Sequence, residues 1–242
     1  MLFDILFSLK WFSGFTGCTV IQMYLQKYTS LDRSKAWVIT CILFQIYFVS
    51  YAGINIYNEW YQLKSHTELQ LSTLDNMYII YGYFIYDIIY MFEEGGYVPP
   101  RRNNEVVETH NNKLFLAHHI ISLIIINTIK QLGITETWYH SILCFILEVT
   151  NPFLNLRQLP LIKNSPSLKI LNKRIIFITY LCFRIILLPI VFISFFIKTF
   201  SDNSYPITIC ISFASIYTVS VMWFQKIILM QNFKGNDFLK NY

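Results

Sequence analysis

Two adjacent histidines, His118 and His119, lie a few residues inside a long hydrophobic stretch of the sequence. An imidazole titrates near neutral pH, so it can act as a general base, as a nucleophile or as a metal ligand. Ionisable side chains are costly inside a lipid bilayer, and where they occur there they usually mark a functional site. A structural role is also open. Neighbouring helical residues point about 100° apart, so one histidine can simply hydrogen-bond across a helix interface.

The composition explains why this pair stands out. Of the 242 residues, 55% are hydrophobic and 14% are charged, and long apolar runs recur along the whole chain. This pattern is typical of an all-α, polytopic membrane protein with a single membrane domain. The net charge of +5 does not call for nucleic acid, because basic residues gather in the cytosolic loops of membrane proteins. We expect membrane lipids, and no nucleic acid, among the partners.

Seven apolar segments predict seven transmembrane helices, each of a length that suits a hydrocarbon core of about 30 Å. They are residues 3–26, 36–57, 76–92, 114–130, 138–156, 175–197 and 206–230. The first is the weakest candidate, because Asp4 and Lys10 lie within it. The chain then divides into a first helix with its cytosolic loop (1–35), a membrane domain (36–232) and a short cytosolic tail (233–242).

The basic residues predict the orientation of these helices. One set of alternating loops carries 14 Lys and Arg residues, whereas the opposite set carries three, Lys64, Lys130 and Lys198. Basic residues favour the cytosolic side of a membrane, so the N-terminus is predicted to be lumenal and the C-terminus cytosolic. The membrane is expected to be the endoplasmic reticulum or another endomembrane.

With this orientation, a rise of about 1.5 Å per residue places several polar side chains at similar depths. Four of them lie roughly 6–8 Å inside the cytosolic ends of three helices: Asp87, His118, His119 and Asn151. Glu148 and Arg184 lie deeper, at roughly 12–14 Å, and are natural partners for an ion pair. We expect a polar cavity that opens to the cytosol and is lined by the third to the sixth helices.

A metal site is not expected from the sequence. Of the other histidines, His66 and His140 map to the opposite side of the membrane, and His110 lies in a loop on the cytosolic side. The five cysteines all fall inside apolar runs without zinc-like spacing, so they are interpreted as small packing residues.

Four sequence segments resemble the TLC-domain family, the superfamily of the ceramide synthases. They are GYFIYDIIYMF around Asp87, FLAHHIISL with the two histidines, LEVTNPFLNLR about thirty residues later, and SVMWFQKIILM near the C-terminus. The similarity covers about residues 36–232. It implies a fold in which six of about seven transmembrane helices form a barrel around a cytosol-facing cavity.

The residues of the family motif match in part. His118 and His119 correspond to its histidine pair, and Ser122 to a threonine that follows them. Its later block corresponds to Leu147, Glu148, Thr150, Asn151, Leu154 and Asn155. Leu147 and Glu148 replace a histidine and an aspartate, and Asn151 replaces a second aspartate. The chain is therefore more similar to the divergent members of the family, many of which lack an assigned reaction.

The resemblance implies a role in lipid metabolism, with acyl-CoA as cosubstrate, no permanently bound cofactor, and a long-chain amine such as a sphingoid base as acceptor. One imidazole would act as nucleophile or base, oriented by Asp87 or Glu148 as in a triad. The implied catalytic residues are Asp87, His118, His119, Glu148 and Asn151, and the implied substrate-cavity residues are Ser122, Thr150 and Arg184. The alternative is a non-catalytic protein that binds lipid, regulates lipid composition or sorts cargo. A homodimer is left open.

Overall fold

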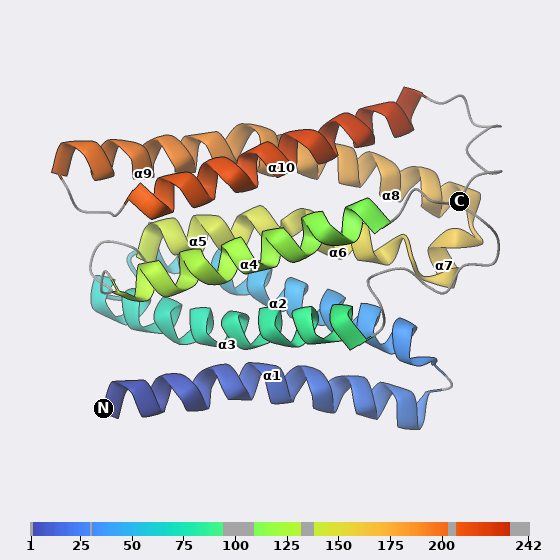
Figure 1. Ribbon diagram of the computed structural model, residues 1–242, viewed down its shortest axis with the longest axis horizontal. Helices are drawn as coiled ribbons and strands as arrows, with labels where there is room; N and C mark the ends of the chain where they lie inside the picture. Colours follow the sequence, from blue (N-terminus) through green and yellow to red (C-terminus); the bar gives the residue numbers. More distant parts are fainter. Residues whose placement is uncertain (1, 30, 94–108, 132–137, 203–206, 233–242) are drawn as a thin grey trace. The chain divides into compact units, whose positions relative to one another are not determined.

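The computed structural model describes residues 2–29, 31–93, 109–131, 138–202 and 207–232, and within these ranges the chain is helical and contains no strand (Figure 1). The elements are α1 (Leu2–Tyr28), α2 (Arg33–Trp60), α3 (His66–Glu93), α4 (Thr109–Gln131), α5 (Trp138–Ile146), the 3₁₀ helix η1 (Leu147–Thr150), α6 (Asn151–Leu156), α7 (Pro160–Lys163), α8 (Pro166–Thr179), the π-helix η2 (Tyr180–Leu187), α9 (Leu188–Asp202) and α10 (Ile207–Asn232). The all-α prediction is confirmed for these residues.

Each of the seven predicted segments falls on helical residues, but several bounds differ. The third helix begins at His66 rather than at residue 76, and the fourth begins at Thr109 rather than at 114. Within the described ranges, two helical stretches are long and apolar enough to cross a membrane by length and composition, Arg33–Trp60 and Pro166–Ser194. Shorter apolar helices cover Leu116–Thr128, Ser141–Leu156 and Cys210–Gln225.

Local capping explains two of the helix starts. The Asp32 carboxylate accepts a hydrogen bond of 2.8 Å from the backbone N–H of Lys35, which caps the N-terminus of α2. Ser65 and Glu68 form a reciprocal capping box: Glu68 accepts from the Ser65 backbone N–H at 2.8 Å, and Ser65 Oγ accepts from the Glu68 N–H at 3.3 Å. This box lets α3 begin in a polar stretch that hydrophobicity alone assigns to a loop.

The chain forms two compact units, one up to Ile146 and the other from Leu147 onward. In the first unit, α1 packs along α3 (Figure 1), and the backbones of the two helices approach each other closely. A methyl group at Gly82 would overlap the backbone carbonyl of Trp11 and lie 2.8 Å from the backbone nitrogen of Phe15, and one at Gly14 would overlap the carbonyl of Ile79. Both positions require glycine because two helix backbones meet there.

Polar contacts reinforce this packing. Lys10, a charge inside the apolar α1, forms an ion pair with Asp75 of α3. Tyr86 of α3 donates a hydrogen bond to the Gln22 side chain of α1. The charge that weakens the first segment as a span therefore has a partner on the neighbouring helix.

In the second unit, two segments depart from the α-helical pattern. The 3₁₀ helix η1 precedes Pro152, which lies in the first turn of α6 where a missing N–H is tolerated. The π-helix η2 ends just before Pro189. In a regular α-helix, the proline ring would clash with the backbone carbonyl four residues earlier. The core beside them joins α8, η2 and α10, where the Tyr180 ring stacks on Phe224 at 5.9 Å and its hydroxyl donates to the Ser220 carbonyl at 3.1 Å.

Candidate functional site

The central feature of the first unit is a direct contact between Asp87 and His119. Asp87 lies on α3 in an aromatic run, and His119 lies on α4. The Asp87 Oδ2 and His119 Nε2 atoms are 2.5 Å apart, and the two residues are 4% and 7% exposed. A carboxylate and an imidazole in this arrangement form a charge-assisted hydrogen bond shielded from water. The sequence placed both residues at one depth, and the structure brings them together.

The other carboxylate oxygen is held by α2. Trp37 Nε1–H donates to Asp87 Oδ1 at 2.9 Å, and the Cys41 thiol lies 3.5 Å from the same oxygen. Trp37 and Cys41 are four residues apart, so they occupy one face of the helix. Neither was a candidate from sequence, and Cys41 was interpreted as a packing residue. The depth argument applied to α2 would have found them, because both lie near the predicted cytosolic end of that helix.

The hydrogen bond to Asp87 fixes which nitrogen of His119 is chemically available. A carboxylate accepts and does not donate, so Nε2 carries the proton and donates it to Asp87. In the neutral form of the ring, Nδ1 holds the lone pair, and this atom is buried without a hydrogen-bond partner. The Phe84 ring flanks the imidazole edge-to-face with centroids 5.0 Å apart. His119 is thus an imidazole oriented by Asp87, with its Nδ1 left without a partner.

His118 has a different environment. His118 is 4% exposed, and its ring centroid lies 5.6 Å from that of His119. Its backbone carbonyl accepts a 2.8 Å hydrogen bond from the Ser122 hydroxyl, within α4. The sequence could not say which histidine meets the aspartate, and the structure assigns this contact to His119.

The second unit contains the predicted ion pair. Arg184 Nη2 donates to Glu148 Oε1 at 2.9 Å, with side chains 4% and 17% exposed. Asn151 donates from its side-chain amide to the other Glu148 oxygen. Glu148 lies in η1 and Arg184 in η2, so both partners belong to the non-α segments. The expected pairing of Glu148 with Arg184 is confirmed.

Thr150 completes this group of motif residues. It is fully buried, and its hydroxyl has no hydrogen-bond partner. An unsatisfied buried hydroxyl is uncommon, because leaving it without a partner costs about 1–3 kcal/mol. Thr150 is therefore a position where a bound polar group would be stabilised.

The candidate residues thus fall into two groups, one in each unit. Asp87 and His119 meet in the first, with His118 and Ser122 nearby on α4, whereas Glu148, Arg184 and Asn151 meet in the second beside Thr150. Of the two carboxylates considered for orienting the imidazole, Asp87 contacts it, and Glu148 is engaged by Arg184 and Asn151. The expected cavity and the common tier with Asn151 combine residues of both units and stay predictions.

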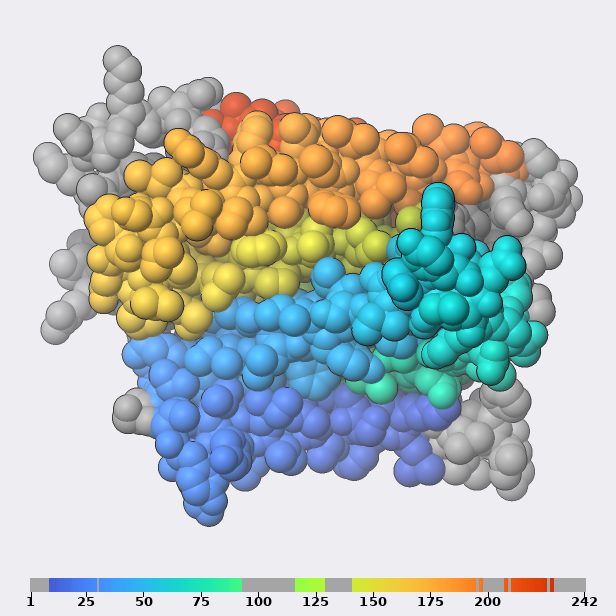
Figure 2. Space-filling view, turned by 180° about the vertical axis from the view of Figure 1, so that it is seen from behind, coloured from blue at the N-terminus to red at the C-terminus, as the bar shows by residue number. Residues whose placement is uncertain are grey.

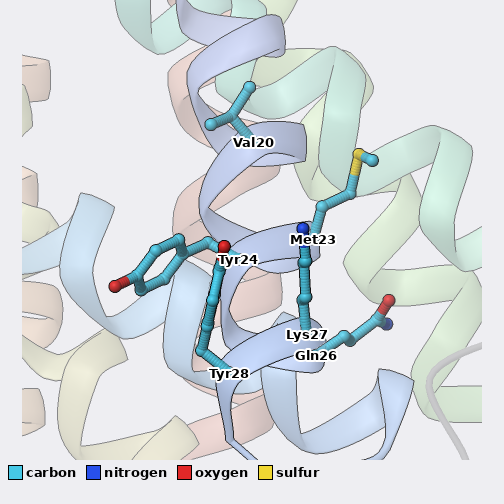
Figure 3. A pocket seen from close by; sticks show the side chains of 6 residues that line it. All are labelled: Val20, Met23, Tyr24, Gln26, Lys27 and Tyr28. Carbon is cyan, nitrogen blue, oxygen red and sulfur yellow. The ribbon is translucent and has the colours of Figure 1, made fainter.

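Across the described residues, no three His, Cys, Asp or Glu side chains cluster as a metal site would require; the side chains of His110 and His140 lie outside the description. A surface pocket lies on the last turns of α1 (Figure 3), and none of the predicted site residues lines it. In this pocket, the ring centroids of Tyr24 and Tyr28 are 4.5 Å apart, and the Lys27 ammonium lies over the Tyr28 ring.

The long helices also expose many large apolar side chains. Figure 2 shows the outer surfaces of α1 and α2 in blue and of α8 and α9 in yellow to orange. Exposed residues there recur at helical spacing, for example Ile186, Ile190, Ile193 and Ile197 in η2 and α9. Such continuous apolar surface is unfavourable in water and marks contact with lipid or with another protein.

The described residues are helical, with apolar outer surfaces and a buried carboxylate–imidazole pair, which are features found in membrane-associated helical proteins. Residues 33–229 match the model of the TLC domain, so the chain belongs to the TLC-domain family. The match confirms the resemblance seen in the sequence, and α1 lies outside it. No curated protein and no solved structure matches the chain. Membership of this family indicates a membrane-associated protein with a lipid-related function.

Proposed function

We propose that the protein transfers an acyl group from acyl-CoA to a long-chain amine or a related lipid, with His119 as the reacting base. The observation that carries this proposal is the Asp87–His119 pair with an unpartnered Nδ1. An imidazole oriented by a carboxylate is the arrangement by which enzymes activate a nucleophile for attack on an acyl carbon. The family match supports the lipid-related setting of this chemistry.

The proposed reaction converts an amine and an acyl thioester into an amide and a free thiol. The neutral amine attacks the thioester carbonyl, and a C–N bond forms while the amine loses one proton to Nδ1 of His119. The C–S bond then breaks, and the CoA thiolate takes that proton and leaves as the free thiol. The products are an amide and CoA. Asp87 stabilises the imidazolium that exists between these two proton transfers, as carboxylates do in triads.

The Glu148–Arg184 pair has a separate role in this proposal. Glu148 and Asn151 correspond to aspartates of the ceramide-synthase motif that the sequence resembles, and both Glu148 oxygens already have partners. We infer that this pair holds η1 against η2. Arg184 and Thr150 would also donate hydrogen bonds to a polar lipid or CoA group. Catalytic roles for Glu148 and Asn151 stay part of the proposal.

We further propose that the chain crosses the membrane seven times, with a lumenal N-terminus and a cytosolic C-terminus, in the endoplasmic reticulum or another endomembrane. The basic residues support this orientation, and the two long apolar stretches and three shorter ones support several of the spans. Acyl-CoA is a cytosolic molecule with a lipid-soluble tail, so a site within the cytosolic leaflet suits it. Six of the helices would form the barrel around the cavity.

A second candidate function is lipid binding without catalysis, in lipid regulation or cargo sorting. The observation that favours it is the engagement of both Glu148 oxygens at a position where the family motif carries an aspartate. A carboxylate held in this way is less available for proton transfer. The two candidates share the same residues and differ in turnover.

The test uses the purified full-length protein in proteoliposomes with mass-tagged acyl-CoA, sphingoid bases and lysolipids. We expect amide or ester product from the wild type and a loss of roughly a hundredfold or more in His119→Gln, the usual scale for removing a general base. His66→Gln is the matched control, because His66 is exposed at the start of α3. If the wild type forms no product with any acceptor but retains lipid that His119→Gln loses, the binding function replaces the enzymatic one.

A further inference from the structure

We infer that Trp37 is a positioning residue for the catalytic pair: it holds Asp87 in the orientation that leaves Nδ1 of His119 as the reactive nitrogen. This inference rests on the proposed function for its effect on turnover. Its structural content, the alignment of Asp87 and His119 by Trp37, can be measured separately.

The two oxygens of the Asp87 carboxylate contact different helices. Its Oδ1 accepts from Trp37 on α2, and its Oδ2 faces His119 Nε2 on α4. A carboxylate can rotate about its bond to Cβ, and rotation would exchange the two oxygens or turn both away from the imidazole. A strong donor fixed on Oδ1 opposes this rotation, because an N–H donor left buried without its acceptor costs about 1–3 kcal/mol.

Trp37 is itself held firmly. Its ring stacks on Tyr90 of α3 with centroids 4.6 Å apart and an angle of 5° between the planes. The guanidinium carbon of Arg33, one turn earlier in α2, lies 5.5 Å from the centre of the same Tyr90 ring. Tyr90 and Asp87 are three residues apart on α3, so the tryptophan contacts this helix through both its face and its N–H. Trp37 is 3% exposed.

Cys41 is the weaker holder of the same oxygen. Its thiol lies 3.5 Å from Oδ1, and a thiol is a poor hydrogen-bond donor beside an indole N–H. Without the indole donor, the thiol alone would not fix the carboxylate. Trp37 therefore acts on catalysis through Asp87 and does not touch the reacting atoms.

The primary test is Trp37→Phe, which keeps an aromatic ring for the Tyr90 stack and removes only the donor and the second ring. Trp60→Phe is the matched control, because Trp60 ends the same helix and is 81% exposed. We expect kcat for acyl transfer to fall about 10–100-fold in Trp37→Phe, the scale seen when a partner that orients a functional imidazole is removed. KM for acyl-CoA should change less than about twofold, because Trp37 is buried against Asp87 and Tyr90.

The second measurement does not depend on activity. The chain has five histidines, so ring-¹⁵N histidine labelling in proteoliposomes gives few signals, and His119→Gln identifies that of His119. We expect a single form with the proton on Nε2 in the wild type and in Trp60→Phe, and a mixture of ring forms in Trp37→Phe. Trp37→Phe/Cys41→Ser should regain part of the single form, because a hydroxyl is a stronger donor than a thiol.

The outcomes separate the two proposals. A single, wild-type-like His119 form in Trp37→Phe overturns the inference, whatever the activity. A mixed form in Trp37→Phe together with a wild type that transfers no acyl group upholds the positioning role and rejects the proposed function. Wild-type kcat in Trp37→Phe overturns the catalytic effect of this role. If Trp37→Phe does not accumulate, Tyr90→Leu removes the stack that seats the indole and should produce the same mixture of forms.

Discussion

Glu148, which is partly buried, and Arg184, which is buried, form an ion pair between two helical segments that are not α-helical, one 3₁₀ and the other π. The first prediction follows from burial. Removing one partner of such a pair leaves an uncompensated charge, so Arg184→Ala and Glu148→Ala should each lower the free energy of unfolding by about 3–5 kcal/mol. The double variant Glu148→Leu/Arg184→Met should recover most of this loss, because two apolar side chains need no partner.

Unfolding of the detergent-solubilised variants, arranged as a double-mutant cycle, measures this effect. Arg174→Ala is the control, because Arg174 is an exposed arginine of the preceding helix and its loss should cost about 0.5 kcal/mol or less. Equal stability losses in Arg174→Ala and Arg184→Ala would contradict a special role for the pair.

The close approach of α1 and α3 predicts opposite effects at two glycines. Gly82→Ala should destabilise the protein by about 1–3 kcal/mol, because its methyl group would overlap the backbone of α1. Gly53→Ala should stabilise it by up to about 1 kcal/mol, because Gly53 lies inside α2 with no atom near the new methyl group and alanine favours the helix. Thermal unfolding in one detergent compares the two, and stabilisation by Gly82→Ala would refute the close packing.

Asp32 predicts a dependence of stability on pH. Hydrogen bonds from the side chain and backbone of Lys35 lower the pKa of Asp32 below its ordinary value of 3.8. A lowered pKa means that the stabilisation is present above about pH 4, the unfolded value, and is lost as the pH falls through the folded value. The side chain is about half exposed, so the effect should be a few tenths of a kcal/mol.

Two substitutions separate the cap from the charge. Asp32→Ala should cost about 1 kcal/mol at pH 7, because α2 loses its N-cap. Asp32→Asn should keep most of that stability, because asparagine also caps helices, and should remove the contribution that titrates below pH 4. Denaturation at pH 3 and pH 7 measures both, and an identical pH response in the wild type and Asp32→Asn would show that Asp32 does not titrate with folding.

The two histidines should differ in their importance. Asp87 hydrogen-bonds His119, so His119→Gln should reduce acyl transfer more than His118→Gln does. Both variants should retain the fold, because glutamine fills a similar volume and can hydrogen-bond. Steady-state kinetics in proteoliposomes compares them. A larger loss in His118→Gln would move the reacting nitrogen to the other imidazole.

The seven-span topology is tested by labelling. Lys64→Cys lies between α2 and α3, and Lys240→Cys lies in the predicted cytosolic tail. In a background without the native cysteines, an impermeant thiol reagent added to sealed vesicles should reach one of them and not the other. Labelling of both from the same side would reject the five crossings predicted between Lys64 and Lys240.

The sequence by itself determined the helical class, the seven helical regions, the family, and the residues with chemical potential, including Asp87, His119, Glu148 and Arg184. These follow from composition, apolar run length and motif spacing, which act locally along the chain. Only the tertiary structure decided which groups meet. Asp87 hydrogen-bonds His119, and Trp37 and Cys41 share the other carboxylate oxygen, because three helices bring particular faces together. The start of α3 and the 3₁₀ and π segments were also missed, because a capping box extends α3 into a polar stretch and prolines adjoin the two non-α segments.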